Sequence, residues 1–217
     1  MSDFSQAVYA IGREEGGVLA LLGTAFAVGP RKIATAFHVT GPNDAGLAMA
    51  LPRIPSLLDY QDTSDHSIKT VPLRIVAADP LRDLCVLEIA PPEISVTFHY
   101  TLSGTDAAPP GSSVVAFGFP HATSGRMVLT QQFAHVGARV LIENSGQKSK
   151  HMILNTQARD GQSGGPIFDQ QLRSVVAILI GSYAPSGGGG ISLGGIDPTT
   201  LHQTTHAISA EYLGAML

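Results

Sequence analysis

The chain of 217 residues contains a single cysteine, Cys85, and no tryptophan. One cysteine excludes a disulfide within the chain, whereas secreted domains commonly contain several. Residues 1–6 also lack the basic segment and the small-residue cleavage site of a secretory signal. We therefore expect a cytoplasmic protein in a reducing compartment.

Charged residues are scarce as well, at 14% of the chain, and aromatic residues make up only 6%. The net charge of −4 comes without a basic stripe that aromatic residues interrupt, which argues against nucleic acid as a partner. No stretch is long and apolar enough to cross a bilayer, so we expect no membrane partner. These absences leave substrate contacts as the main interactions to explain.

Glycine is abundant instead, with 24 copies, and its most informative cluster surrounds Ser163 in the segment Ala-Arg-Asp-Gly-Gln-Ser-Gly-Gly-Pro at residues 158–166. Glycine adopts positive φ at little cost, so successive N–H groups can converge on one point. Such a point binds an oxyanion, and the amides of Gly161 and Ser163 would stabilise a developing carbonyl oxyanion by about 3 kcal/mol per donor. A plain turn between two strands is the competing interpretation of the same residues.

Two upstream segments favour the chemical interpretation. The apolar, β-rich run Ile-Ala-Thr-Ala-Phe-His-Val ends near His38, whose side chain is a natural general base at neutral pH. Asp83 stands directly before the alternating run Leu-Cys-Val-Leu-Glu-Ile, where a carboxylate at a strand end can orient an imidazole. A serine hydroxyl needs such a base, and the base works best when a third group orients it. We therefore expect His38, Asp83 and Ser163 to form a catalytic triad.

In this order, Thr-Ala-Phe-His-Val, Asp-Leu-Cys-Val-Leu and Gly-Gln-Ser-Gly-Gly-Pro resemble the three signatures of the trypsin-like (chymotrypsin-fold) serine proteases. The greatest likeness is to their cysteine-poor bacterial HtrA-like branch. The resemblance implies His38 as base, Asp83 as orienting acid, Ser163 as nucleophile, and an oxyanion hole from the amides of Gly161, Gln162 and Ser163. It departs from the pattern at Gln162, where asparagine or aspartate is common, and at Phe37, where small residues are usual.

The same resemblance implies an all-β fold of two six-stranded antiparallel β-barrels with a C-terminal α-helix. We expect one trypsin-like serine protease domain over residues 1–217. Its parts are the first barrel over about residues 1–90, a crossover over 91–110, the second barrel over 111–196, and the helix over 197–217. Leu201, Ile208 and Tyr212 provide the apolar stripe of that helix.

The resemblance also places the substrate pocket. Its base is expected at Gln157, and Asp160 is expected at the rim because it belongs to the oxyanion loop. One wall is expected from the strand residues Leu179, Ile180, Gly181 and Ser182. No buried carboxylate is evident that could receive a lysine or arginine side chain, so we expect cleavage after a small or medium aliphatic residue.

Two alternative sites are weaker. Cys85 lies inside an alternating strand without a glycine-rich cradle, so we interpret it as a core thiol and not as a nucleophile. His202 and His206 have the spacing of a zinc-binding helix, but Gln203 replaces the glutamate that such enzymes use, and no third ligand is evident. We therefore expect no metal and no organic cofactor.

The sequence thus predicts a serine endopeptidase that acts on a protein or peptide through an acyl-enzyme. The glycine-rich oxyanion loop could rest in a collapsed, latent form, so we also expect a regulatory protein partner and a role in bacterial stress or defence. The alternative from another class is a binding or scaffold protein that has this fold with latent or lost catalysis.

Overall fold

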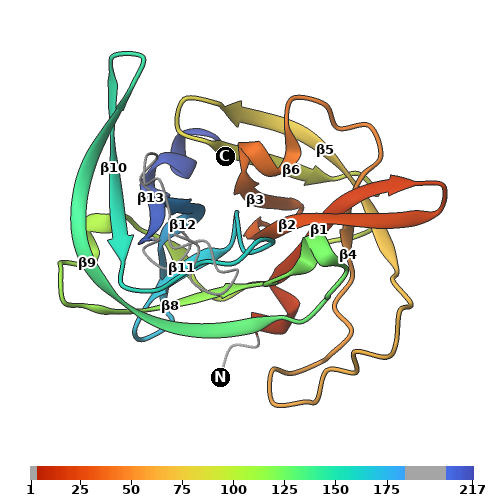
Figure 1. Ribbon diagram of the computed structural model, residues 1–217. Coiled ribbons are helices and arrows are strands. Elements are labelled where there is room, and N and C mark those ends of the chain that lie inside the picture. The colour runs from red at the N-terminus through yellow and green to blue at the C-terminus, as the bar shows by residue number, and fades with distance from the viewer. Residues whose placement is uncertain (1–3, 184–203) are drawn as a thin grey trace, which may run out of the picture.

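The computed structural model describes residues 4–183 and 204–217, which form two β-barrels joined by a crossover (Figure 1). Six antiparallel strands close the first barrel in the order β1-β2-β3-β6-β5-β4. Because the ring is closed, no strand of it presents an unpaired edge. The strands are β1 (Val8–Glu15), β2 (Val18–Gly29), β3 (Lys32–Ala36), β4 (Leu47–Ala50), β5 (Thr70–Asp79) and β6 (Leu84–Ile89).

The second sheet has the order β11-β8-β9-β10-β13-β12-β7, and an additional pairing of β11 with β12 closes it. The short strand β7 lies outside the ring and pairs in parallel with β12. The prediction of two six-stranded antiparallel barrels is therefore confirmed. The strands are β7 (Thr101–Leu102), β8 (Ser113–Gly118), β9 (Thr130–Asn144), β10 (Gln147–Leu154), β11 (Pro166–Asp169), β12 (Ser174–Tyr183) and β13 (Thr204–Ser209).

Helical segments are short. They are the α-helix α1 (Phe37–Thr40) and the 3-10 turns η1 (Phe4–Gln6), η2 (Thr105–Ala107), η3 (Ala122–Ser124) and η5 (Ala210–Ala215). Within residues 4–183 and 204–217, no helix is long and apolar enough to span a membrane.

Aromatic residues connect the N-terminal segment and the crossover to the second barrel. Phe4 stacks on Phe117 with ring centroids 4.8 Å apart and meets the edge of Phe168 at the same distance. Tyr100 also packs edge-on against Phe168, and its hydroxyl donates to the Ala27 carbonyl in β2 at 2.7 Å. These contacts fix the two barrels against each other at one end of the interface.

The C-terminal segment corrects the expected α-helix over residues 197–217. Thr204–Ser209 form β13, which pairs with β10 on one side and β12 on the other. Within residues 204–217, helix is limited to Ala210–Ala215, which form a short 3-10 segment. The strand is favoured because Thr204, Thr205 and Ile208 are β-branched, and because it supplies the last member of the closed second ring. That ring therefore extends to Ser209, whereas Leu201 and residues 186–197 lie outside the described residues.

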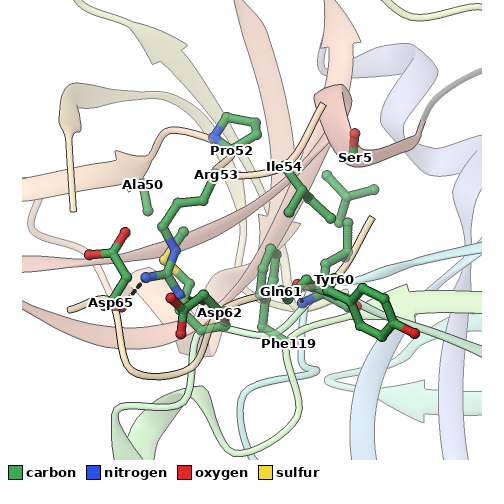
Figure 2. Close-up of a pocket in the computed structure, with 13 residues that line it drawn as sticks. Ser5, Ala50, Pro52, Arg53, Ile54, Tyr60, Gln61, Asp62, Asp65 and Phe119 are labelled. Carbon is green, nitrogen blue, oxygen red and sulfur yellow. Dashed lines mark hydrogen bonds between the residues drawn. The ribbon is translucent and has the colours of Figure 1, made fainter. Parts of the chain in front are cut away.

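The long connection between β4 and β5, residues 51–69, packs against the segment between β8 and β9, residues 119–129. Gln61 joins them twice: its Nε2 donates to the Leu129 carbonyl and its Oε1 accepts from the Leu129 amide, both at 2.8 Å. A cavity lies between these two segments and η1, β1 and β4 (Figure 2).

Candidate active site

His38 and Asp83 lie together because β3 and β6 are neighbours in the first barrel. Ala36 at the end of β3 pairs with Leu84 at the start of β6, so the residues beyond each end meet. The Nδ1 atom of His38 is 2.6 Å from Asp83 Oδ2, and the His38 amide donates to Asp83 Oδ1 at 2.7 Å. Because the carboxylate is an acceptor, it favours the tautomer with a proton on Nδ1. The Nε2 atom is then available as a base.

The turn that carries Asp83 has a left-handed conformation at this residue, with φ of 57°. A non-glycine residue needs support to hold that conformation. Arg82 provides some of it, because its amide and its Nη1 both donate to the carboxylate of Asp79, at 3.1 and 2.7 Å. The Arg82 guanidinium also lies 4.4 Å from the ring centroid of Tyr212 in η5. Through Arg82, the turn that carries Asp83 therefore contacts η5 near the C-terminus.

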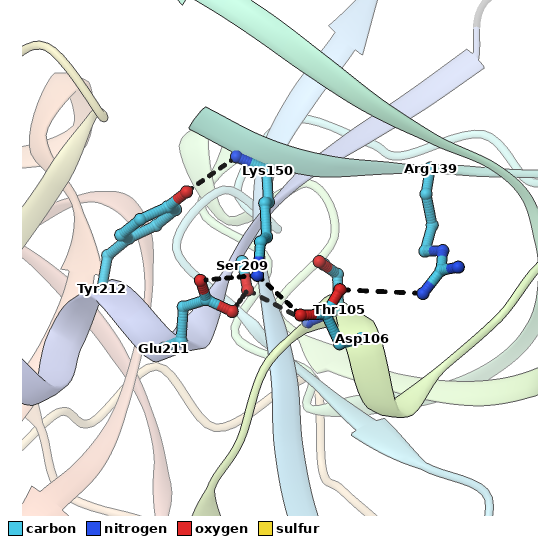
Figure 3. Close-up of polar contacts among 7 residues, drawn as sticks. All are labelled: Thr105, Asp106, Arg139, Lys150, Ser209, Glu211 and Tyr212. Carbon is cyan, nitrogen blue, oxygen red and sulfur yellow. Dashed lines mark hydrogen bonds and ion pairs between the residues drawn. The ribbon is translucent and has the colours of Figure 1, made fainter. Parts of the chain in front are cut away.

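Tyr212 is itself anchored by the second barrel (Figure 3). Its hydroxyl accepts a hydrogen bond from the Lys150 amide at 2.8 Å. The Lys150 ammonium lies 2.6 Å from Asp106 and 3.2 Å from Glu211, so β10, η2 and η5 are held together around Tyr212.

Ser163 belongs to the loop between β10 and β11 in the second barrel. Its carbonyl accepts from the Thr24 amide of β2 at 2.9 Å, which joins the two barrels at the site. A Cβ at Gly23 would lie 2.7 Å from the Val39 side chain and 2.9 Å from the Ser163 carbonyl oxygen. Only glycine therefore lets the serine loop approach the turn that carries His38.

The hydroxyl of Ser163 is directed toward the second barrel. It donates to the Ile180 carbonyl in β12 at 2.9 Å, and no hydrogen bond joins it to His38 in the described structure. The structure thus brings His38 and Asp83 into direct contact, while Ser163 would need a side-chain rotation to donate to His38.

The loop that is expected to provide the oxyanion donors contacts both barrels. Gly161 has a φ of 91°, and its carbonyl accepts from the Thr24 hydroxyl at 2.7 Å. The Asp160 carbonyl accepts from the His121 amide at 2.6 Å. Within residues 4–183 and 204–217, the amides of Gly161 and Ser163 donate to no protein acceptor. Both donors are available to a ligand oxygen.

Gln162 differs from the other two expected oxyanion donors. Its amide donates to the Arg159 carbonyl at 3.0 Å. Its side chain is buried, accepts from the Arg159 amide at 2.7 Å, and donates to Gln132. This residue therefore braces the loop, and its amide is not a free donor. The expectation of three donors is reduced to Gly161 and Ser163.

The expected pocket residues lie on two elements next to Ser163. Leu179 is buried, while Ile180 and Gly181 are partly exposed where β12 changes register against β13. The backbone of Ser182 pairs with Thr205. Asp160 is exposed, as a rim position requires, and Gln157 accepts a hydrogen bond from Arg159 Nη1 at 2.8 Å.

Comparison with known proteins identifies the domain. Residues 23–178 match the family model described as a trypsin-like peptidase domain. The chain belongs to this family. Proteins named "Probable periplasmic serine endoprotease DegP-like", from Brucella suis and Brucella abortus, are 33% identical to it over 116 residues, which are 53% of this chain and 21% of theirs. The match thus spans about a fifth of the length of these relatives.

Solved structures show the same fold. The MamO protease domain from Magnetospirillum magneticum, in its apo form, aligns with a TM-score of 0.68 at 16% identity and covers 98% of this chain and 96% of that one. The HtrA-type protease AlgW with a decapeptide aligns with a TM-score of 0.67 at 18% identity, over 98% of this chain and 63% of that one. The resemblance to trypsin-like proteases of the HtrA-like branch is confirmed.

Sequence reasoning missed two residues of this peptidase domain. Thr24 is fully buried, donates to the Gly161 carbonyl, and accepts from the Phe119 amide at 3.1 Å, so one hydroxyl holds the oxyanion loop against its support. A polar residue inside the apolar run of β2 was the signal. Arg159 contacts the expected pocket base, and its place inside the serine motif was the corresponding signal.

The alternative sites have other environments. Cys85 is buried in β6, and burial is the main cause that raises the pKa of its thiol, which keeps it protonated. His206 lies in β13 and not on a helix, and burial lowers its pKa. His202 lies outside the described residues. Among the residues that the structure describes, no group of three or more His, Cys, Asp or Glu side chains could hold a metal ion.

Proposed function

We propose that the chain is a serine endopeptidase that hydrolyses peptide bonds through Ser163, His38 and Asp83. Two observations carry the proposal: two hydrogen bonds join His38 to Asp83, and the glycine loop around Ser163 has two amides, of Gly161 and Ser163, without a protein acceptor among the described residues. A base in a defined tautomer and a pair of oxyanion donors are what acyl transfer to serine needs.

The mechanism follows from these positions. The His38 Nε2 atom removes the proton of the Ser163 hydroxyl while Oγ bonds to the substrate carbonyl carbon. The amides of Gly161 and Ser163 stabilise the oxyanion. The C–N bond then breaks as His38 transfers its proton to the leaving amine, and water releases the acyl group by the reverse sequence of proton transfers. Side chains and backbone supply every step, so the proposal includes no metal or organic cofactor.

The substrate can activate Ser163 by competing for the Ile180 carbonyl. This carbonyl holds the Ser163 hydroxyl in the described conformation. An N–H of a peptide bound beside β12 would compete for this carbonyl and release the hydroxyl toward His38. Substrate binding would then complete the catalytic arrangement.

A fluorophosphonate probe tests the nucleophile directly, because it phosphonylates an activated serine and needs no peptide specificity. We expect labelling of the wild type at Ser163 and none in Ser163→Ala. The Ser112→Ala variant, a serine outside the site, should label normally. Labelling that persists in Ser163→Ala, or a wild type that resists the probe after incubation with peptide substrates, would contradict the proposal.

For specificity, we propose cleavage after a small or medium aliphatic residue. The wall at Leu179 and Ile180 is apolar, and Asp160 is exposed at the rim. Cleavage profiling with a peptide library measures this preference. A dominant preference for lysine or arginine would refute it and implicate Asp160.

The resting bond from Ser163 to Ile180 also favours a regulated enzyme. We propose a resting state with low activity that a partner protein relieves, in preference to the alternative of a scaffold without catalysis, because the His38–Asp83 pair is intact. Probe labelling of the purified chain compared with labelling in lysate tests this. Equal and complete labelling would remove the need for a partner. The expected role in bacterial stress or defence stays a prediction.

The relatives bear on the compartment. The expected cytoplasmic location is not supported by them, because the curated Brucella proteins are named periplasmic. Cys85 does not discriminate between the compartments. It is buried and is the single cysteine of the chain, so it can form no internal disulfide even under oxidising conditions. Fractionation of the native host is the direct measurement.

A further inference from the structure

The cavity between residues 51–69 and 119–129 lies outside the candidate active site. Its volume is about 130 Å³, and its floor consists of buried apolar side chains from β1, β4 and the second barrel (Figure 2). None of its lining residues belongs to the triad, the oxyanion loop or the expected substrate pocket. The buried floor residues are Val8, Ala50, Phe119, Met127 and Leu129.

One wall of this cavity is also the support of the oxyanion loop. The Phe119 side chain lines the cavity, and the Phe119 amide donates to Thr24 Oγ, which in turn donates to the Gly161 carbonyl. A Cβ at Gly161 would overlap the Phe119 carbonyl oxygen and would lie 2.7 Å from the Ala122 amide nitrogen. The Phe119 backbone is thus connected through Thr24 to Gly161, one of the two free oxyanion donors.

The polar rim of the cavity carries two carboxylates, Asp62 and Asp65, and one cation, Arg53. Arg53 donates to the backbone carbonyls of Asp65 and Met127. The side-chain amide of Gln61 forms its hydrogen bonds with the backbone of Leu129. The carboxylates of Asp62 and Asp65 accept from nearby Ser64 and Ser67 but form no ion pair among the residues described. Arg53 is the only cation among the described lining residues, so the two carboxylates leave the rim with a net negative charge. A cation on the ligand complements that charge.

The shape of the surface favours a polypeptide. A second cavity of about 210 Å³ lies across the Arg53–Met127 contact and shares Arg53, Asp65 and Met127 with the first. Each is smaller than the roughly 300–1,000 Å³ of a small-molecule pocket, so each has the size for a single side chain. Two large side chains of the same loop, Leu58 and Tyr60, are exposed, and Tyr60 is at the cavity mouth (Figure 2). Exposed apolar residues at a hollow are typical of a protein-binding surface.

We propose that this cavity is a regulatory site for a polypeptide segment that carries an apolar side chain next to a lysine or arginine. The apolar side chain fills the space against Phe119, and the cation pairs with Asp62 and Asp65. Occupation packs the 119–129 segment more tightly and thereby holds the Gly161 amide in the oxyanion-binding position. The proposal rests on the proposed peptidase function for its effect on activity, but not for binding itself.

Binding is measured first on the Ser163→Ala protein, so that no probe peptide is cleaved. The probes are fluorescent hexapeptides with one central leucine or phenylalanine between lysines, and matched peptides with glutamate in place of lysine. We expect the lysine peptides to bind about threefold to fivefold more tightly, as exposed ion pairs allow. The substitutions Tyr60→Ser and Asp62→Asn should weaken binding several-fold. Asp59→Asn changes the same charge in the same loop outside the cavity and should have little effect.

Activity is measured next, as the rate of fluorophosphonate labelling of the wild type. A saturating lysine peptide should raise this rate several-fold, whereas Tyr60→Ser should keep its basal rate and lose the increase. Ala50→Leu fills the cavity from β4, so it should raise the basal rate and abolish peptide binding. Leu141→Ser, which removes an exposed apolar residue of β9, serves as the control for surface changes.

Three results would overturn the site. The first is an absence of binding, and the second is equal binding of the lysine and glutamate peptides. The third is binding that disappears when Ser163 of the wild type is blocked with the probe, because this would place the peptide in the substrate cleft. If the peptides bind as expected but the wild type never labels, the peptidase proposal fails and the binding site stands.

Discussion

The two halves of the candidate active site are held in different ways. In the first barrel, His38 and Asp83 are joined by two hydrogen bonds, and the Asp83 turn is fastened by Arg82. In the second barrel, the Ser163 hydroxyl is bonded to the Ile180 carbonyl, away from its expected base. The base is preorganised, whereas the nucleophile must rotate. A regulator of activity should therefore act on the second barrel, where Ser163 must rotate. Substitutions of Asp83 or of its support should instead impair the base in the first barrel.

The largest effect should come from breaking the first-barrel pair with Asp83→Asn. An amide can present its N–H to Nδ1 and so favour the wrong tautomer of His38, with the proton on Nε2. Turnover should fall by about 10⁴-fold with a folded protein, and kcat/KM on a peptide substrate measures it. If turnover stays near the wild-type value, the pair is a structural contact, and the first barrel does not provide a preorganised base.

The second-barrel half should respond to Thr24→Val, which keeps the shape of the side chain but removes its hydroxyl. The Gly161 carbonyl and the Phe119 amide would both lose their partner, so we expect the free energy of unfolding to fall by about 1–3 kcal/mol. The oxyanion loop would also lose its anchor, and labelling of Ser163 should slow by about 10- to 100-fold.

Thr24→Val should leave the His38–Asp83 pair intact. Proton NMR of the His38 Nδ1–H measures this directly. A change in that resonance equal to the change in Asp83→Asn would show that the two halves are one coupled unit.

The parts of the site that could be predicted from sequence are those that local chemistry determines. Gly161 and Gly164 have positive φ, as their motif indicated, and a Cβ at Gly164 would overlap Thr24 and Thr35. The adjacency of His38 and Asp83 was predicted from a base near the end of one apolar run and a carboxylate directly before another, and the family resemblance implied the same pair. By contrast, β13 could not be separated from a helix, because Leu201, Ile208 and Tyr212 also fit a helical period.

Long-range contacts were the other limit. The Arg82–Tyr212 contact joins residues far apart in the chain, and only the folded position of η5 creates it. The rotamer of Ser163 depends on the Ile180 carbonyl at a register change in β12, which no local pattern encodes.

The second barrel should also lose stability in acid. His151 in β10 is buried, with no hydrogen-bond partner for Nδ1 among the described residues, and burial followed by the nearby His206 lowers its pKa to about 4. The unfolded chain binds this proton at about pH 6.5. Stability from His151 is therefore full above that pH and is lost as the pH falls toward 4, by up to about 3 kcal/mol.

Urea denaturation at several pH values measures this loss. His151→Phe should flatten the profile between pH 6.5 and 4, whereas His135→Phe, at an exposed position of β9, should leave it unchanged. A His151→Phe profile as steep as that of the wild type would place the acid sensitivity elsewhere.

The smallest effect should come from changing Arg82, which supports the turn that carries Asp83 in the first barrel. Arg82→Ala removes the contacts to Asp79 and Tyr212 that support the left-handed turn at Asp83. We expect kcat to fall by about tenfold, equivalent to about 1.4 kcal/mol, with KM unchanged, because the acid would be misplaced while the pocket stays intact. Arg82→Lys should recover most of the loss, since an ammonium can still pair with Asp79 and approach the ring.

Tyr212 supplies the matched pair of variants. Tyr212→Phe keeps the ring under Arg82 and loses only the contact from the Lys150 amide, so kcat should change little. Tyr212→Leu removes the ring and should resemble Arg82→Ala, with a lower kcat and an unchanged KM. A purely structural role would lower the unfolding free energy of both Tyr212 variants and leave the kcat of the folded proteins unchanged. Asp83 would then hold its conformation without help from η5.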